Sequence, residues 1–293
     1  MKIGIFLLFG LLLTFTPVHG AETGRTGPAF SIGTWNFELD PGHRPYPEYL
    51  ADPRRMRFAL GVAGFDSDIS ESSGMRAMLD AAVRYTLFRV ETGGGRDFAL
   101  EILGGVFLQF DMGEKLDSIG YDGLYGANLV FGINDRWTTR LCYRHLSAHI
   151  GDEYVERTGR ERVGYTREDL AIGVAWQFHD RWLAYVEPGW ATRNGNRERQ
   201  ADLSFDGGLQ YEGPRRLWND SSAFYAGLHV RAFEESDWKP GISVQTGFHV
   251  RGRADRTNVR MGLEAYTGRA ILGEYALDFD ESYLLASFML DFY

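Results

Sequence analysis

The chain has 293 residues and carries 31 Lys and Arg against 40 Asp and Glu, which gives a formal net charge of −9. This acidic balance argues against nucleic acid as a partner, because polyanions are bound by clustered basic residues. The single cysteine, Cys142, excludes a fold held together by disulfide bonds. Aromatic residues make up 14% of the chain and glycines number 36, a mixture typical of membrane barrels, in which rings anchor at the interfaces and glycines ease curvature.

The first twenty residues have the pattern of an export signal. Lys2 precedes an unbroken apolar run over residues 3–13, and the small-residue exit Val18-His19-Gly20 follows. The run is shorter than the roughly 20 residues that a membrane-spanning helix needs. We therefore expect a signal peptide over residues 1–20 that is cleaved after Gly20. Residues 21–53 alternate poorly and contain several prolines, and we expect them to form a periplasmic lead-in to one domain over residues 54–293.

From there to the end of the chain, apolar and polar residues alternate with a period of two. The last segment is the clearest case, since Leu284, Phe288 and Leu290 fall on one face while Ser287 and Asp291 fall on the other. This is the pattern of a strand with one face toward lipid and one toward a lumen. We predict twelve strands near residues 56–65, 77–91, 97–112, 121–133, 135–149, 164–178, 181–193, 202–213, 222–234, 239–252, 257–268 and 282–293.

The face opposite the apolar one carries many charges. These are Arg84, Glu101, Arg140, Arg144, Glu187, Asp206, Glu212, Arg231, Arg251, Arg260 and Glu264. The dry core of a soluble β-sandwich does not hold such residues, whereas a barrel lumen does. We therefore expect an all-β fold, a closed antiparallel transmembrane β-barrel of about twelve strands with a polar lumen and short periplasmic turns. Long side chains of both signs favour a filled interior over an open pore.

Three stretches carry a resemblance to a known family. Tyr49-Leu-Ala-Asp-Pro-Arg54, Gly104-Gly-Val-Phe-Leu-Gln-Phe-Asp111 and Tyr143-Arg-His-Leu-Ser-Ala-His-Ile-Gly-Asp-Glu-Tyr154 resemble the bacterial family catalogued as domain of unknown function 1207. The resemblance implies an outer-membrane barrel of a Gram-negative-type bacterium and no established activity. Phe292, at the end of the last strand, resembles the signal that barrel assembly machinery reads.

The fifth predicted strand carries polar residues where lipid is expected. Continuing its outward phase places His145, Ser147 and His149 on the lipid-facing side, beside an outer loop. Outer-membrane phospholipase A and the lipid A 3-O-deacylases are similar here, with an outward His two residues before a Ser. The resemblance and the spacing suggest Ser147 as nucleophile and His145 as base, oriented by Glu168 on the next strand or, less well, by Thr166 or Asn128.

The loop after this strand is acidic. Asp152 and Glu153 offer the oxygen ligands that a hard cation such as Ca²⁺ prefers, and such a cation would bridge to lipopolysaccharide. A solvated acidic loop is the alternative. Two functions remain open. The protein is a hydrolase of outer-leaflet lipid esters, working as a monomer or homodimer, or a barrel without catalysis that acts as a narrow pore or as a structural surface protein.

Overall fold

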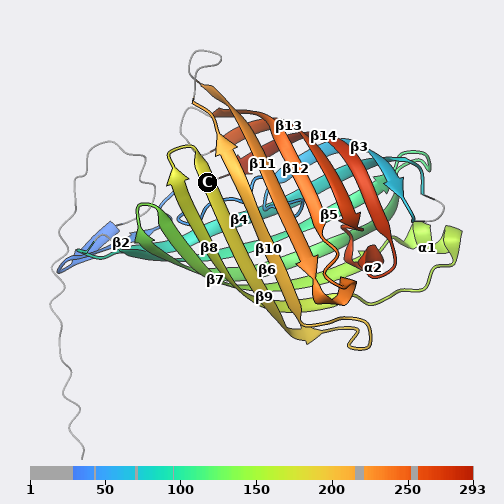
Figure 1. The fold of residues 1–293 in the computed structure, drawn as a ribbon, viewed down its shortest axis with the longest axis horizontal. Helices are drawn as coiled ribbons and strands as arrows, with labels where there is room; N and C mark the ends of the chain where they lie inside the picture. The colour runs from blue at the N-terminus through green and yellow to red at the C-terminus, as the bar shows by residue number, and fades with distance from the viewer. Residues whose placement is uncertain are drawn as a thin grey trace, which may run out of the picture.

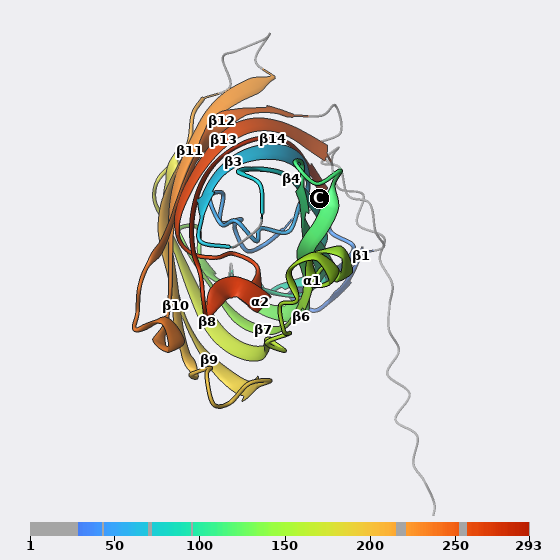
Figure 2. The same ribbon diagram turned by 90° about the vertical axis from the view of Figure 1, so that its right-hand side faces the viewer.

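The computed structural model describes residues 29–42, 44–69, 72–94, 96–214, 221–251 and 257–292, so the predicted signal peptide lies outside the described residues. Twelve of the described strands form a closed antiparallel barrel (Figures 1 and 2), because the last strand pairs with the first. They are β3 (Phe58–Ser67), β4 (Met75–Glu91), β5 (Asp97–Asp111), β6 (Asp117–Asn134), β7 (Trp137–Ile150), β8 (Thr166–His179), β9 (Trp182–Asn194), β10 (Leu203–Glu212), β11 (Ser222–Phe233), β12 (Gly241–Arg251), β13 (Thr257–Arg269) and β14 (Asp280–Phe292).

The period-two pattern places apolar side chains on the outside of this barrel. On β14, Leu284 and Phe288 are 61% and 48% exposed, whereas their inward neighbours Leu285 and Met289 are buried. Lipid is the solvent that such an apolar outer surface requires. Each predicted strand overlaps one barrel strand, and no predicted end differs from the observed one by more than four residues. The predicted fold class is confirmed.

The interior is charged, as predicted. Arg140 donates to Glu187 over 2.8 Å and Arg231 donates to Asp206 over 2.6 Å. The other predicted lumenal charges with described side chains are buried or half-buried inside the wall, while the side chain of Arg251 is not among those described. Pairing is what makes these ions tolerable away from bulk water.

The two ends of the barrel differ. At one end, β6 is joined to β7, and β8 to β9, by two residues each. At the other end, long loops hold α1 (Asp152–Thr158), η1 (Glu234–Ser236) and α2 (Gly273–Ala276), with α1 and α2 visible in Figure 1. Buried apolar residues join the loops of α1 and α2 to the β3–β4 loop in a cap; they are Ile69, Ile119, Ile150, Tyr154, Ala270, Leu272 and Tyr275. Within the described part of the chain, no helix is long and apolar enough to cross a membrane.

A girdle of aromatic rings circles part of the short-turn end. Trp137 stacks on Trp176 at 5.2 Å between ring centroids, Trp182 contacts Tyr211 at 4.9 Å, and Phe224 contacts Phe248 at 5.9 Å. Such rings mark the level at which a barrel meets the membrane interface. The short-turn end of a barrel of this type is the periplasmic one, and the long loops therefore lie on the outer side.

The segment before the barrel differs from the prediction. A hairpin of β1 (Ala29–Ile32) and β2 (Trp35–Leu39) extends the wall by pairing with the short-turn end of β4. Residues 44–57, which we call the plug, then run inside the lumen instead of outside in the periplasm. Figure 2 shows this blue segment within the ring of strands. The sequence of the plug alone could not predict this position, because the wall charges that pair with the plug lie on strands far away in the chain.

Candidate functional site

The candidate site lies on the outer face of the barrel, where β7 and β8 approach the long loops. Leu146 and Ala148 are each 6% exposed and face inward. The alternation of β7 therefore turns His145, Ser147 and His149 outward, which is the orientation that the sequence predicted. A serine and two histidines thus stand on a surface otherwise built for lipid.

Ser147 is in contact with a histidine, although not with the predicted one. Its Oγ lies 3.1 Å from Nε2 of His149, whereas the sequence assigned this contact to His145. Both histidines are two residues from Ser147 on the same face of one strand, so the period-two pattern cannot choose between them. The choice is made by the neighbours of each ring, which come from other strands.

The ring of His145 is held by its neighbours across the sheet. It stacks on Tyr125 of β6 with 4.6 Å between centroids and an interplanar angle of 21°. Its Nδ1 lies 3.5 Å from Oε1 of Glu168, the residue opposite it on β8. The predicted association of His145 with Glu168 is therefore present in the structure. In this arrangement His145 contacts the carboxylate of Glu168 and the ring of Tyr125, and the hydroxyl of Ser147 contacts His149 instead.

His149 has a similar support on β6. Its ring stacks on Tyr121, with 4.7 Å between centroids and 20° between planes. Tyr121 and Tyr125 are four residues apart, as are His149 and His145, and each tyrosine pairs with one histidine in register. Each imidazole is thus backed by one tyrosine, and Ser147 lies between them opposite Gly123 of β6 and Thr166 of β8. Gly123 has no side chain, so the residue directly opposite Ser147 on β6 places no side chain beside it.

A β-bulge on β9 adds a cation that sequence reasoning missed. Glu168 pairs with Arg193 and Asp169 pairs with Ala191, so Thr192 is an extra residue in the strand. The bulge turns Thr192 and Arg193 both outward, because an inserted residue shifts the alternation by one. Arg193 Nη1 consequently lies 3.5 Å from Oε1 of Glu168. The sequence does not indicate the bulge, because the residues from Ala191 to Asn194 are compatible with regular alternation of inward and outward side chains.

The remaining predicted residues lie elsewhere. Asn128 is fully buried on the lumenal side, where it donates to Glu101 over 2.8 Å, so the wall separates it from Ser147. Thr166 faces Ser147 across the sheet. Asp152 is exposed and pairs with Arg162 at 2.8 Å, and Glu153 is exposed beside it. No group of three or more His, Cys, Asp or Glu residues that could hold a metal occurs among the described residues.

The comparisons with known proteins identify the family. The model of the family described as a protein of unknown function, DUF1207, matches residues 36–284. The chain belongs to the DUF1207 family. No protein with a curated description matches this DUF1207 chain by sequence.

Solved structures with a similar fold include two phospholipases. Outer membrane phospholipase A from Escherichia coli is similar with a TM-score of 0.54 and 10% identity, over 81% of this chain and 94% of that one. The Salmonella typhi outer membrane phospholipase, a dimer with bound calcium, is similar with a TM-score of 0.54 and 12% identity, over 85% of this chain and 94% of that one. At such identities the likeness shows the fold alone. This DUF1207 chain therefore has the fold of an outer-membrane β-barrel.

Proposed function

We propose that the protein is an outer-membrane ester hydrolase that cleaves acyl esters of outer-leaflet lipid at Ser147. The observation that carries the proposal is the 3.1 Å contact between Ser147 Oγ and His149 Nε2 on the lipid-facing wall. A serine hydroxyl is a weak nucleophile unless a base takes its proton, and an adjacent imidazole is the usual base. The position near the long-loop end corresponds to the outer leaflet, where lipid esters lie against the barrel. The same fold carries a phospholipase in both neighbours.

The reaction follows from this contact. Ser147 Oγ attacks the ester carbonyl carbon while its proton moves to Nε2 of neutral His149, and a tetrahedral oxyanion forms. The bond to the alcohol oxygen then breaks, and the imidazolium returns its proton to the leaving alcohol. A water molecule attacks the resulting acyl-serine with His149 again as base, which releases the fatty acid and restores the serine.

His145 and Glu168 form the second half of the proposed site. Their contact of 3.5 Å resembles the base and orienting carboxylate of a triad, but the ring of His145 is stacked on Tyr125. The ring of His149 is stacked on Tyr121 in the same way, but its Nε2 contacts Ser147 Oγ. We therefore propose His149 as the base and His145 with Glu168 as positioning residues that line the lipid-facing surface beside the serine.

Replacing Ser147 with Ala tests the proposal. The purified barrel is incubated in mixed micelles with a phospholipid or with lipid A, with Ca²⁺ or with a chelator, and released fatty acid is measured. We expect Ser147→Ala to abolish release. Ser282→Ala is the matched control, because Ser282 is a serine on β14 whose hydroxyl bonds Thr267 on the outer face. Absence of release from the wild type with both lipids, or equal release from Ser147→Ala, would rule out the hydrolase.

A further inference from the structure

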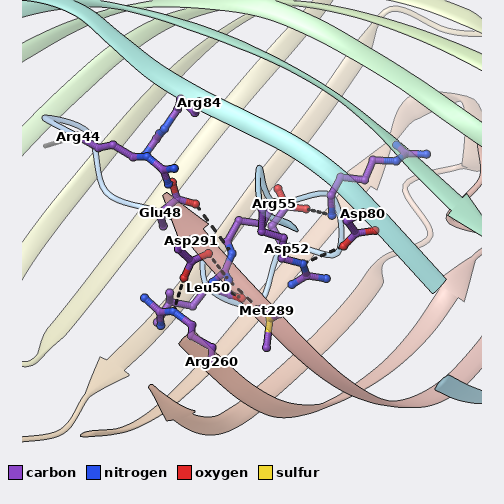
Figure 3. A network of polar contacts seen from close by, with 12 residues as sticks. Arg44, Glu48, Leu50, Asp52, Arg55, Asp80, Arg84, Arg260, Met289 and Asp291 are labelled. Carbon is purple, nitrogen blue, oxygen red and sulfur yellow. Dashed lines mark hydrogen bonds and ion pairs between the residues drawn. The ribbon is translucent and has the colours of Figure 1, made fainter. Parts of the chain in front are cut away.

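Ion pairs tie the plug to the wall of the lumen, beside apolar contacts made by its tyrosines and Leu50. Five of its charged residues each reach a partner on the wall, and Figure 3 shows part of this network. The pairs are Glu48 with Arg84 at 2.9 Å, Asp52 with Arg231 at 3.4 Å, Arg54 with Asp122 at 2.6 Å, Arg55 with Asp291 at 3.1 Å, and Arg57 with Asp80 at 2.9 Å. These partners lie on β4, β6, β11 and β14, so the plug is tied to several parts of the wall.

The wall is also shaped to receive the plug. A Cβ atom on the lumenal glycine Gly227 would lie 3.1 Å from Cβ of Ala51, and one on Gly173 would lie 2.6 Å from the hydroxyl of Tyr46. Tyr49 stacks on Tyr185 with 3.7 Å between centroids and 4° between planes. These close fits show that the plug occupies a defined seat.

An ionic interface of this kind differs from an apolar core in one respect. Water that replaces the plug can solvate every wall charge that the plug now pairs, so much of the Coulomb energy lost on separation is recovered as hydration. An apolar seat would gain nothing from water. The lumen is therefore built to be stable when filled by the plug and wettable when the plug moves.

Empty space already follows the plug through the barrel. A cavity of about 360 Å³ lies at the short-turn end, one of about 90 Å³ in the middle, and one of about 50 Å³ beneath the long loops. The first and second share the plug residue Glu48, and the second and third share Arg54. The cavities thus mark an interrupted path from one mouth to the other, with the plug forming the partitions.

The middle cavity and the cavity beneath the long loops, which we call the upper cavity, are lined by described residues with an excess of positive charge. Seven arginines face the middle cavity against four carboxylates, and three arginines and one lysine face the upper cavity against one glutamate. The chain as a whole has the opposite sign, with a net charge of −9. A path lined in this way attracts anions and repels cations, because the field inside a narrow low-dielectric channel follows the nearest charges.

We propose that the barrel is also a channel for small anions and that the plug is its gate. Strand pairing tethers the plug at both ends, at Leu39 with Phe88 and at Phe58 with Ala81. The gate therefore opens by displacement within the lumen, while the rest of the wall stays in place. This activity uses the inside of the barrel and is independent of Ser147 on the outside.

The test combines a loosened plug with a reversible lock. Asp52→Asn removes the ionic tie to Arg231 and leaves every arginine that lines the cavities in place. Leu50→Cys with Gly227→Cys supplies the lock, because a Cβ on Gly227 lies 3.5 Å from Cβ of Leu50, within the roughly 3.5–4.5 Å spanned by disulfides. Cys142→Ser removes the native thiol. Folding of each variant is checked by its heat-dependent shift on a detergent gel, and Glu48→Gln, which removes the tie to Arg84, replaces Asp52→Asn if that variant does not fold.

Currents are recorded in planar bilayers across a KCl gradient. We expect the loosened variant to conduct ions when the two cysteines are reduced and to stop conducting when the disulfide forms. The reversal potential of its current should lie near the equilibrium potential of chloride. Arg144→Glu, which changes a charge lining the middle cavity, should shift the reversal potential toward potassium. Silence of the folded, reduced variant, a current that oxidation leaves unchanged, or a cation-selective current would overturn the proposal.

Discussion

At the scale of single residues, the lipid-facing wall brings Ser147 between two histidines that differ in their surroundings. His149 contacts the serine hydroxyl, and His145 lies against Tyr125 and Glu168. The sequence predicted that Ser147 and His145 face outward and that Glu168 lies near His145, because period-two alternation and strand pairing fix which face a residue occupies. It could not predict the contact of His149, since side-chain torsions depend on partners from other strands.

The two histidines give a prediction that separates their roles. Removing a general base costs on the order of 10²- to 10⁴-fold in rate, so we expect His149→Ala to lower fatty acid release by that factor. His145→Ala and Glu168→Gln should each cost about tenfold or less, because they act through positioning. The measurement is the rate of release per folded barrel. The reverse order, with His145→Ala the more severe, would assign the base to His145.

At the scale of elements, the outer loops are joined to one another as well as to the barrel. Asp278, after α2, pairs with Arg160 of the β7–β8 loop at 2.9 Å and with Arg199 of the β9–β10 loop. Partial burial alone would raise the pKa of Asp278, but hydrogen bonds from Arg199 and Arg160 outweigh burial and hold that pKa below its ordinary value. One carboxylate thus ties three loops together.

This tie predicts a pH dependence. A carboxyl with a lowered folded pKa adds stability that is complete above the ordinary Asp pKa of about 3.9 and disappears as the pH falls through the lowered value. We expect proteolytic cleavage in the outer loops to accelerate over that range of acid pH, with an acid-stable protease as the probe. The loops of Asp278→Asn should be cleaved faster than those of the wild type at neutral pH. Their cleavage rate should no longer rise as the pH falls through this range. Identical profiles for the two proteins would show that Asp278 does not hold the loops.

At the scale of the whole molecule, the barrel wall was predictable and its contents were not. Lipid outside and charge inside impose alternation on every wall strand, and this repeated signal placed all twelve strands. The plug has no period, and the hairpin β1–β2 is too short to show one. The fit of Ala51 against Gly227 and the pairing of Arg57 with Asp80 are contacts between segments that are apart in the sequence. Such contacts cannot be predicted from a single sequence before the fold is known.

Interior ion pairs should therefore decide the stability of the barrel. Arg57 is almost fully buried, donates to Asp80 over 2.9 Å and lies 3.8 Å from Glu264. Arg57→Ala leaves both carboxylates without this partner, and breaking a buried pair in this way costs about 3–5 kcal/mol. Arg162→Ala is the matched control, because its pair with Asp152 is exposed and such pairs contribute about 0–1 kcal/mol. The free energy of unfolding is measured by urea titration in detergent. Equal losses for the two variants would mean that water entering beside the plug replaces Arg57, and that the ties of the plug contribute little to folding.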